Sequence, residues 1–484
     1  MLKRYFLPLL LLVGLSSCYR ILSSEGGGQG NIRTDSRPVD ATDIELPAGY
    51  TAEVVAKGLT FPTNITFDEQ GTPYVIEAGY SYGEVFLEPK LLRLEQDGGL
   101  TQIAAGQKNG PWTGVTYHNG NFYISEGGQL EGGKILRVTP DGSFTTLAEG
   151  LPSLGDHHTD AFVIGKDGYI YFGQGTATNS AVVGRDNYDF GWLKRFPEFH
   201  DIPCNDVTLT GQNYTTESPL ETKPGIQTTG AYSPYGTPTE KGQVIKGSIP
   251  CSGAVMRVST EGGPIELVAW GFRNPFGIAF ALDGKLYVTD NGYDDRGSRP
   301  AWGTGDYLWQ VQPATWYGWP DFSGGIAFNG KKFGVPGEES PEPVLADYPN
   351  MPPKPTATLG VHSSSNGMDF SKNNNFGYQG EAFIAQFGDM APSVGKILDP
   401  VGFKVVRVDV SNGKITDFAV NKGKENGPAS KLKHGGLERP IAVKFSPDGQ
   451  SLYIVDFGVV KMTEQGAVPQ LETGVVWKIT KENQ

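Results

Sequence analysis

A short motif of apolar residues around one basic or amide residue recurs six times along the chain, at 91–94, 135–138, 255–258, 308–311, 405–408 and 476–479. Its alternation of apolar and polar positions predicts a half-buried β-strand at each copy. Upstream of most copies lie two further strands joined by a turn such as Asp283-Gly284, a dipeptide that supplies the positive φ angles of a tight hairpin. Six copies of one strand unit predict six blades of a β-propeller.

Each repeat is expected to form four antiparallel strands, which make up one propeller blade. After the copy at 135–138, for example, the turn Asp141-Gly142 leads into another strand at 144–148. The sixth copy lacks such a strand, because the chain ends at Gln484 shortly after Ile479. The segment 50–56 stands directly before the first blade, so we predict that it pairs with the last blade and closes the ring, which removes the open sheet edges.

The predicted fold is therefore all-β, and the propeller is expected to span residues 49–484. Blades of ~40–45 residues need roughly 260 residues for six, so the chain must also contain long loops. The longest stretch without the repeat runs from about 177 to 252, and another covers about 317–358. Loops of this length in a compact domain are usually functional.

The charge balance limits the kinds of partner that the protein is expected to bind. The chain of 484 residues has 40 Lys and Arg against 53 Asp and Glu, a formal net charge of −13, and no long basic run. These features exclude nucleic acid as an expected partner. An anionic cofactor would have to be held by local arginines, because the field of the whole protein opposes it.

The N-terminus has the pattern of an export signal. Lys3 and Arg4 precede an apolar run of roughly ten residues, well short of the ~20 that a membrane-spanning helix needs. The run ends in Leu-Ser-Ser-Cys, which resembles the lipobox of bacterial lipoproteins. This resemblance implies that Cys18 is lipidated and becomes the first residue of the mature chain, although a plain secretory signal is the alternative.

We therefore expect a signal peptide over 1–18 and a flexible tether over 19–48. The protein is expected to be exported and held on a membrane, facing the periplasm or the cell exterior. Cys204 and Cys251 are the other cysteines, which suits an exported protein with one disulfide. No Cys-x-x-Cys-His sequence is present, which excludes a covalently attached c-type haem.

Polar residues stand just before the expected inner strand of four blades, at 156–158, 273–274, 362–363 and 439–440. The starts of the inner strands face one mouth of the central channel, so these side chains are expected to converge there. Each one alone is explained as well by a loop residue that bonds the backbone. The adjacent His157 and His158 could be metal ligands, but zinc needs a third protein ligand, and none is nearby in sequence.

Several of these segments resemble the soluble quinoprotein glucose dehydrogenases and their sorbosone and pyranose dehydrogenase relatives. The motifs are Gly-Phe-Arg-Asn-Pro at 271–275, Asp-Asn-Gly at 290–292 and Tyr-Gly-Trp-Pro at 317–320, within a resemblance that spans about 46–480. The family implies a six-bladed propeller that uses pyrroloquinoline quinone (PQQ) and calcium. It also implies a sugar or polyol substrate.

The resemblance places the family's catalytic histidine at His157. A neutral histidine can accept the hydroxyl proton of an alcohol near pH 7. Arg273 and Asn274 are implied to donate hydrogen bonds to the reactive oxygen of the quinone and to stabilise the negative charge that develops there.

Cofactor binding is implied for three further residues. Arg439 falls where an arginine binds the carboxylates of the quinone through charge-assisted hydrogen bonds. The backbone carbonyls of Gly292 and Tyr293 are implied to bind calcium, which accepts such oxygens.

The chain also departs from the family pattern at positions near the cofactor. Thr176 replaces an aspartate, Ile441 replaces a second arginine near Arg439, and Met390 stands where the sorbosone and pyranose branch has an arginine. The quinone-binding lysine has no clear counterpart, although Lys396 and Lys404 lie nearby in sequence.

The resulting hypothesis is a PQQ-dependent dehydrogenase that oxidises a sugar, a sugar derivative or a polyol by hydride transfer and passes the electrons to a further acceptor. One alternative is a propeller lipoprotein that binds a glycan or a protein partner without catalysis, consistent with the missing arginines. A second alternative is a calcium-dependent lactonase of the gluconolactonase type, which is also a six-bladed propeller.

Overall fold

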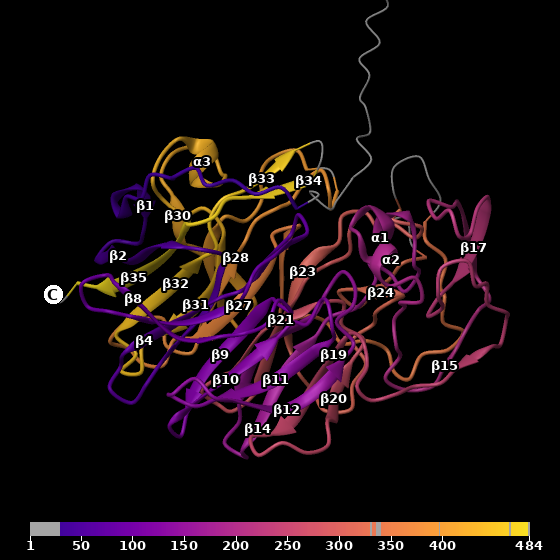
Figure 1. Cartoon of the computed structure of the whole chain (residues 1–484), viewed down its shortest axis with the longest axis horizontal. Helices are drawn as coiled ribbons and strands as arrows, with labels where there is room; N and C mark the ends of the chain where they lie inside the picture. The colour runs from indigo at the N-terminus through magenta and orange to yellow at the C-terminus, as the bar shows by residue number, and fades with distance from the viewer. Residues whose placement is uncertain (1–29, 330–331, 335–339, 396, 464–465, 483–484) are drawn as a thin grey trace, which may run out of the picture.

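Six antiparallel sheets surround a central axis in the computed structural model (Figure 1), which describes residues 30–482 except 330–331, 335–339, 396 and 464–465. The first three blades are β3 (Pro62–Phe67), β4 (Pro73–Glu77), β7 (Lys90–Leu94) and β8 (Leu100–Ala105); β9 (Trp112–His118), β10 (Asn121–Glu126), β11 (Gly133–Val138) and β12 (Phe144–Leu151); and β13 (Thr159–Ile164), β14 (Tyr169–Gln174), β19 (Ala254–Ser259) and β20 (Glu266–Trp270).

The next three blades are β21 (Pro275–Phe280), β22 (Leu286–Asp290), β23 (Gly305–Gln310) and β26 (Ala357–Val361); β27 (Ser365–Phe370), β28 (Ala382–Gln386), β29 (Lys404–Asp409) and β30 (Lys414–Asn421), with β1 (Ile44–Glu45) at the edge; and β31 (Pro440–Phe445), β32 (Ser451–Asp456), β35 (Gly474–Lys481) and β2 (Tyr50–Leu59). The six sequence repeats lie in the third strands of these blades. The predicted six-bladed, all-β fold is confirmed.

The N-terminal strand closes the ring as the sequence predicts. Strand β2 pairs antiparallel with β35, from Tyr50 opposite Lys481 to Leu59 opposite Gly474. Apolar side chains then fill the space between neighbouring blades, as where Ile76 and Leu91 of the first blade share a cluster with Ile124 of the second. Packing between blades is therefore the core of the molecule, and it fixes the strand starts around one channel mouth.

Shorter elements lie in the loops between blade strands. They are β5 (Tyr80–Ser81), β6 (Val85–Phe86), α1 (Arg185–Asp189), α2 (Trp192–Arg195), β15 (Val207–Thr208), β16 (Asn213–Glu217), β17 (Ile226–Gly230), β18 (Val244–Ile245), β24 (Phe322–Ser323), β25 (Ile326–Ala327), α3 (Ala429–Leu432), β33 (Val460–Thr463), β34 (Gly466–Pro469) and a 3-10 turn, η2 (Ala41–Asp43). Within the described part of the chain, no helix is long and apolar enough to cross a membrane.

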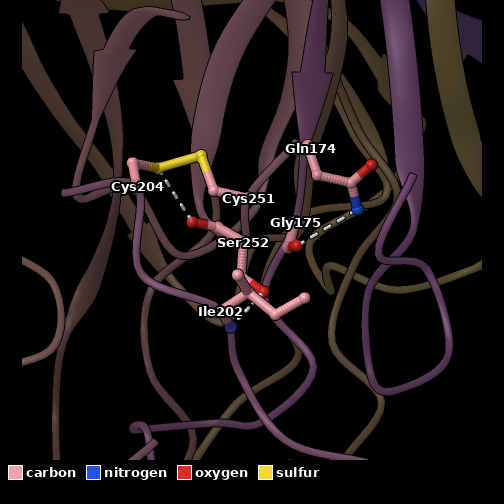
Figure 2. Close-up of a disulfide and its surroundings, with 6 residues drawn as sticks. All are labelled: Gln174, Gly175, Ile202, Cys204, Cys251 and Ser252. Atoms are coloured by element: carbon pink, nitrogen blue, oxygen red, sulfur yellow. Dashed lines mark hydrogen bonds between the residues drawn. A yellow bond between two sulfur atoms is a disulfide. The ribbon is translucent and has the colours of Figure 1, made fainter. Parts of the chain in front are cut away.

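The long insertion leaves the third blade after β14 and returns to it at β19. Its two cysteines are joined, with an S–S distance of 2.10 Å across a sequence separation of 47 (Figure 2). Beside the disulfide, the backbone N–H of Ile202 donates to Oγ of Ser252 at 3.1 Å. The predicted Cys204–Cys251 disulfide is therefore confirmed, and it ties together the two ends of most of the insertion.

The segment before the propeller is less free than the predicted tether of 19–48. The Arg37 side chain is only 4% exposed, and it forms an ion pair with the fully buried Asp456 at 2.9 Å. Its guanidinium also donates to the carbonyls of Gly436 and Thr473. The tether prediction does not hold for this part of the chain, because a buried carboxylate such as Asp456 needs a partner of opposite charge. The predicted signal peptide and Cys18 lie outside the described residues.

Candidate active site

Two connected cavities open at the mouth of the channel, where the inner strands begin. The polar cleft is lined by side chains that include Tyr82, Asp156, His157, Phe190, Trp192, Arg273, Asn274, Asn291, Asp294, Arg296, Asp306 and His362. The upper channel continues toward the axis of the propeller. Both are lined by Tyr82, Asn274, Asn291, Ser364 and Met390, so they form one continuous site.

His157 lines the polar cleft from its place just before β13. Its Nδ1 lies 2.9 Å from the carbonyl oxygen of Thr176, which can only accept, so Nδ1 carries the hydrogen and Nε2 keeps its lone pair. Burial, with a smaller contribution from the neighbouring Arg273 guanidinium, lowers the pKa of His157 well below its ordinary value. His157 is thus a neutral imidazole that can accept a proton at Nε2.

His158 points to the other cavity, since it lines the upper channel rather than the polar cleft. Its Nδ1 lies 3.1 Å from Oδ1 of the fully buried Asp160. The two adjacent histidines therefore line different cavities, and the structure does not bring their side chains together around one metal ion.

Arg273 and Asn274 are positioned by the end of the neighbouring strand. Both of their backbone N–H groups donate to Oδ1 of Asp290, at 3.1 and 2.8 Å. The Arg273 guanidinium then donates to Asp294 at 2.9 Å, and Nδ2 of Asn274 donates to Asn291 at 2.8 Å. Both side chains reach the cleft, as predicted, but the arginine is already paired with a carboxylate.

A charged cluster around Arg296 was not anticipated from the sequence. Its guanidinium lies 2.9 Å from Asp156, 2.6 Å from Asp186 and 2.9 Å from Asp294. These carboxylates come from the residue before His157, from helix α1 and from the loop after β22, so Arg296 holds the insertion against two blades. Burial raises the pKa of Asp186 to about 6 despite this partner. The run of charges at 294–296, directly after the Asp-Asn-Gly motif, was the available signal.

Arg439 does not reach either cavity, which corrects its predicted role at the quinone. Its Nη1 donates to the carbonyls of Phe387, Gly388 and Asp389 at 3.1–3.3 Å, and its Nη2 donates to the carbonyl of Val460 at 3.2 Å. The guanidinium also lies over the Phe387 ring, 4.9 Å from its centroid. Arg439 therefore holds together the backbone behind the channel wall and is not available to a cofactor carboxylate.

The predicted calcium ligands lie beside the polar cleft. Gly292 lines the cleft, and its N–H donates to Asp306 at 3.0 Å. The Tyr293 carbonyl accepts a hydrogen bond from Thr304 at 2.8 Å. The described residues contain no group of three or more His, Cys, Asp or Glu side chains arranged for a metal ion. Calcium binding by the two carbonyls stays a prediction.

The charges around the site do not fit PQQ, which is a tricarboxylate. Among the described lining residues, the only arginines are Arg273 and Arg296, and both are ion-paired with aspartates. Lys404 pairs with Asp417 at 2.8 Å and lines neither cavity, and Lys396 lies outside the described residues. The neutral His157 and the Asn274 amide suit a quinone carbonyl, but no free cation in this part of the structure suits its carboxylates.

Comparison with known proteins confirms the family resemblance and the fold. Residues 241–391 match the family described as glucose/sorbosone dehydrogenase. The PQQ domain of pyranose dehydrogenase from Coprinopsis cinerea is 16% identical, with a TM-score of 0.55 over 93% of this chain and 100% of that chain. The PQQ-bound aldose sugar dehydrogenase from Streptomyces coelicolor is 14% identical, with a TM-score of 0.50 over 90% and 99%.

A third solved structure, a carbohydrate-active enzyme of family AA12 from Trichoderma reesei, is 14% identical, with a TM-score of 0.54 over 93% of this chain and 100% of that chain. No curated protein sequence matches the chain. At these identities the likeness to solved structures establishes the propeller architecture. The chemistry must be argued from the cleft itself.

Proposed function

We propose that the protein is a dehydrogenase that oxidises a hydroxyl group of a sugar, a sugar derivative or a polyol. The observation that carries this proposal is the neutral His157, whose Nδ1 is held by Thr176 and whose Nε2 is free to accept a proton in the polar cleft. The family match over 241–391 and the quinone-dependent sugar dehydrogenases named among the solved structures support the same class of reaction.

The reaction requires a proton and a hydride to leave the same alcohol. Nε2 of His157 takes the proton of the hydroxyl group, the carbon–oxygen double bond forms, and the C–H hydrogen leaves with its electron pair to a quinone-type acceptor. The imidazolium that forms is disfavoured by burial and by Arg273, so His157 returns its proton readily.

The walls of the polar cleft suit a polyhydroxylated substrate. Tyr82 and Phe190 line the cleft with aromatic surface for the C–H groups of a sugar, and the carboxylates and amides of the same lining can bind hydroxyl groups.

A second candidate function is glycan binding without catalysis. The observation that favours it is the pairing of both cleft arginines with aspartates, together with the enclosure of Arg439 by backbone carbonyls. A carbohydrate site needs no free cation, whereas a site for a quinone tricarboxylate does.

Dye-linked oxidation separates the two candidates. Purified protein is supplied with calcium and either PQQ or an uncharged quinone, and dye reduction is measured across a panel of sugars and polyols. Sugar binding is measured in parallel by calorimetry. Sugar-dependent dye reduction with at least one quinone supports the dehydrogenase; sugar binding with no reduction under any combination contradicts it and supports the glycan-binding protein.

We also propose that the protein is exported and anchored to a membrane through Cys18. The lipobox-like sequence supports the anchor, and the backbone N–H of Gly30 donates to the carbonyl of Gly83, between strands β5 and β6. The neighbouring Tyr80 and Tyr82 line the cavities. The residues between Cys18 and Gly30 can span at most about 40 Å, so this anchor would keep the mouth of the cleft close to the membrane.

A further inference from the structure

The wall of the upper channel is built from equivalent positions of the blades. The second residue of five inner strands lines it, and His158 lines it from just before the sixth; the five are Thr63, Thr113, Phe276, Asn366 and Ile441. This layer surrounds the propeller axis, directly inside the polar cleft, with Asn274 and Asn291 on the border between the two.

Among the lining residues that the structure describes, the channel has no Lys, Arg, Asp or Glu, and its polar lining consists of hydroxyl and amide side chains and His158. Its apolar lining includes Phe276, Phe387, Met390, Ile441, Phe457 and Val460. A tricarboxylate placed there would lose its hydration without gaining a cation, which is strongly unfavourable.

Two buried amides in this wall have a side-chain oxygen without a hydrogen-bond partner among the described groups. Asn366 is 5% exposed, and its Oδ1 is buried without a hydrogen bond, while its Nδ2 also bonds none of the described groups. Asn274 is 7% exposed, and its Oδ1 is likewise unpaired. The two oxygens are enclosed by protein, whereas Nδ2 of Asn366 is the hydrogen-bond donor that this wall offers to a ligand in the channel.

We infer that the upper channel binds an uncharged quinone and its hydroquinone, and that this molecule is the acceptor in the reaction of the polar cleft. The inference rests on the proposed dehydrogenase function. A flat ring would pack against Phe276, and a quinone carbonyl would accept from Nδ2 of Asn366.

The electrons and protons balance between the two cavities. The alcohol loses a hydride and a proton and becomes a carbonyl compound. The hydride brings the quinone two electrons and one proton, the proton released by the imidazolium of His157 supplies the second, and the quinone becomes the hydroquinone. No charged cofactor is needed for this exchange, which agrees with the charges around the site.

Equilibrium dialysis of the full chain against duroquinone, an uncharged tetramethylbenzoquinone, tests the inference without any turnover. We expect saturable binding at one site. Asn366→Leu is expected to weaken it about tenfold, because a ligand hydrogen bond is lost, and to leave thermal stability unchanged or raised, because an unpaired buried amide is removed. Asn121→Leu, the same change at the half-buried first residue of β10, which lines neither cavity, is the control and is expected to bind as the wild type does.

Ile441→Arg is the second variant, since it places a cation in the apolar wall. It is expected to weaken duroquinone binding at least tenfold and to strengthen binding of PQQ. Absence of saturable duroquinone binding, unchanged binding in both channel variants, or tighter binding of PQQ than of duroquinone by the wild type would overturn the inference. Saturable binding that both variants weaken, in a protein that oxidises no sugar, supports the site and contradicts the proposed function alone.

Discussion

Replacing Arg296 by Met probes the charged cluster that joins the insertion to the propeller. The guanidinium is 9% exposed and contacts Asp156, Asp186 and Asp294 within 3 Å. Asp294 still forms an ion pair with Arg273 at 2.9 Å, so the substitution removes an ion-pair partner chiefly from Asp156 and Asp186. Removing one partner of a buried ion pair costs about 3–5 kcal/mol, because the remaining charge stays buried without compensation.

The cost of this substitution is expected to depend on pH. The pKa of Asp186 is about 6 while Arg296 is present, and removal of that cation raises it further. The folded variant then binds a proton that the unfolded chain releases above its ordinary aspartate pKa, so its stability falls as pH rises, by about 1.4 kcal/mol per pH unit until the new pKa is passed. Arg296→Met is therefore less destabilising at about pH 5 than at about pH 8.

Equilibrium urea unfolding at the two pH values measures this effect. Arg137→Met is the matched control, because Arg137 pairs at 3.3 Å with Glu261, whose side chain is 78% exposed, and such surface pairs contribute at most about 1 kcal/mol. The reasoning would be refuted if Arg296→Met lowered the free energy of unfolding no more than Arg137→Met does. It would also be refuted if Arg296→Met lowered this free energy equally at both pH values.

Three further outcomes are expected. Folded His157 stays neutral, while the unfolded residue titrates near its ordinary pKa of 6.5, so the free energy of unfolding should fall as pH drops below that value. His157→Gln should flatten this dependence, measured by unfolding at about pH 5 and 7. Equal pH dependence in the variant and the wild type would contradict this prediction. The Cys204→Ser/Cys251→Ser double variant should lose up to about 4 kcal/mol for its 47-residue loop, measured by urea unfolding, and an unchanged midpoint counts against this. Cys18→Ala should move the protein from the membrane to the soluble fraction, and lipid-free wild-type protein by mass spectrometry rules out the anchor.

Features that repeat in the sequence were predictable, since each blade must satisfy the same physical requirements. The alternating motif located the third strand of every blade, and the segment 50–56 could be matched to the last blade because that blade lacked an outer strand. Cys204 and Cys251 could be paired because an exported chain offered them no other partner outside the lipobox.

Features that depend on contacts between distant loops were not predictable. Arg439 precedes an inner strand just as Arg273 does, but the backbone at 387–389 folds over it and takes up its hydrogen bonds. The Arg296 cluster joins three segments far apart in sequence. Arg37 forms an ion pair with Asp456, which lies near the other end of the chain. No local pattern reports such pairings, because each is fixed by the packing of loops around the channel mouth.

The central claim is that His157 removes a proton from a sugar or polyol in the polar cleft, and the turnover of His157→Gln tests it most directly. His200→Gln is the control, because His200 is a half-buried histidine that lines neither cavity. With saturating substrate and quinone, we expect His157→Gln to lower kcat by about 10²- to 10⁴-fold, with sugar affinity unchanged by calorimetry and with the control at the wild-type rate. A His157→Gln enzyme that turns over at the wild-type rate would contradict the account.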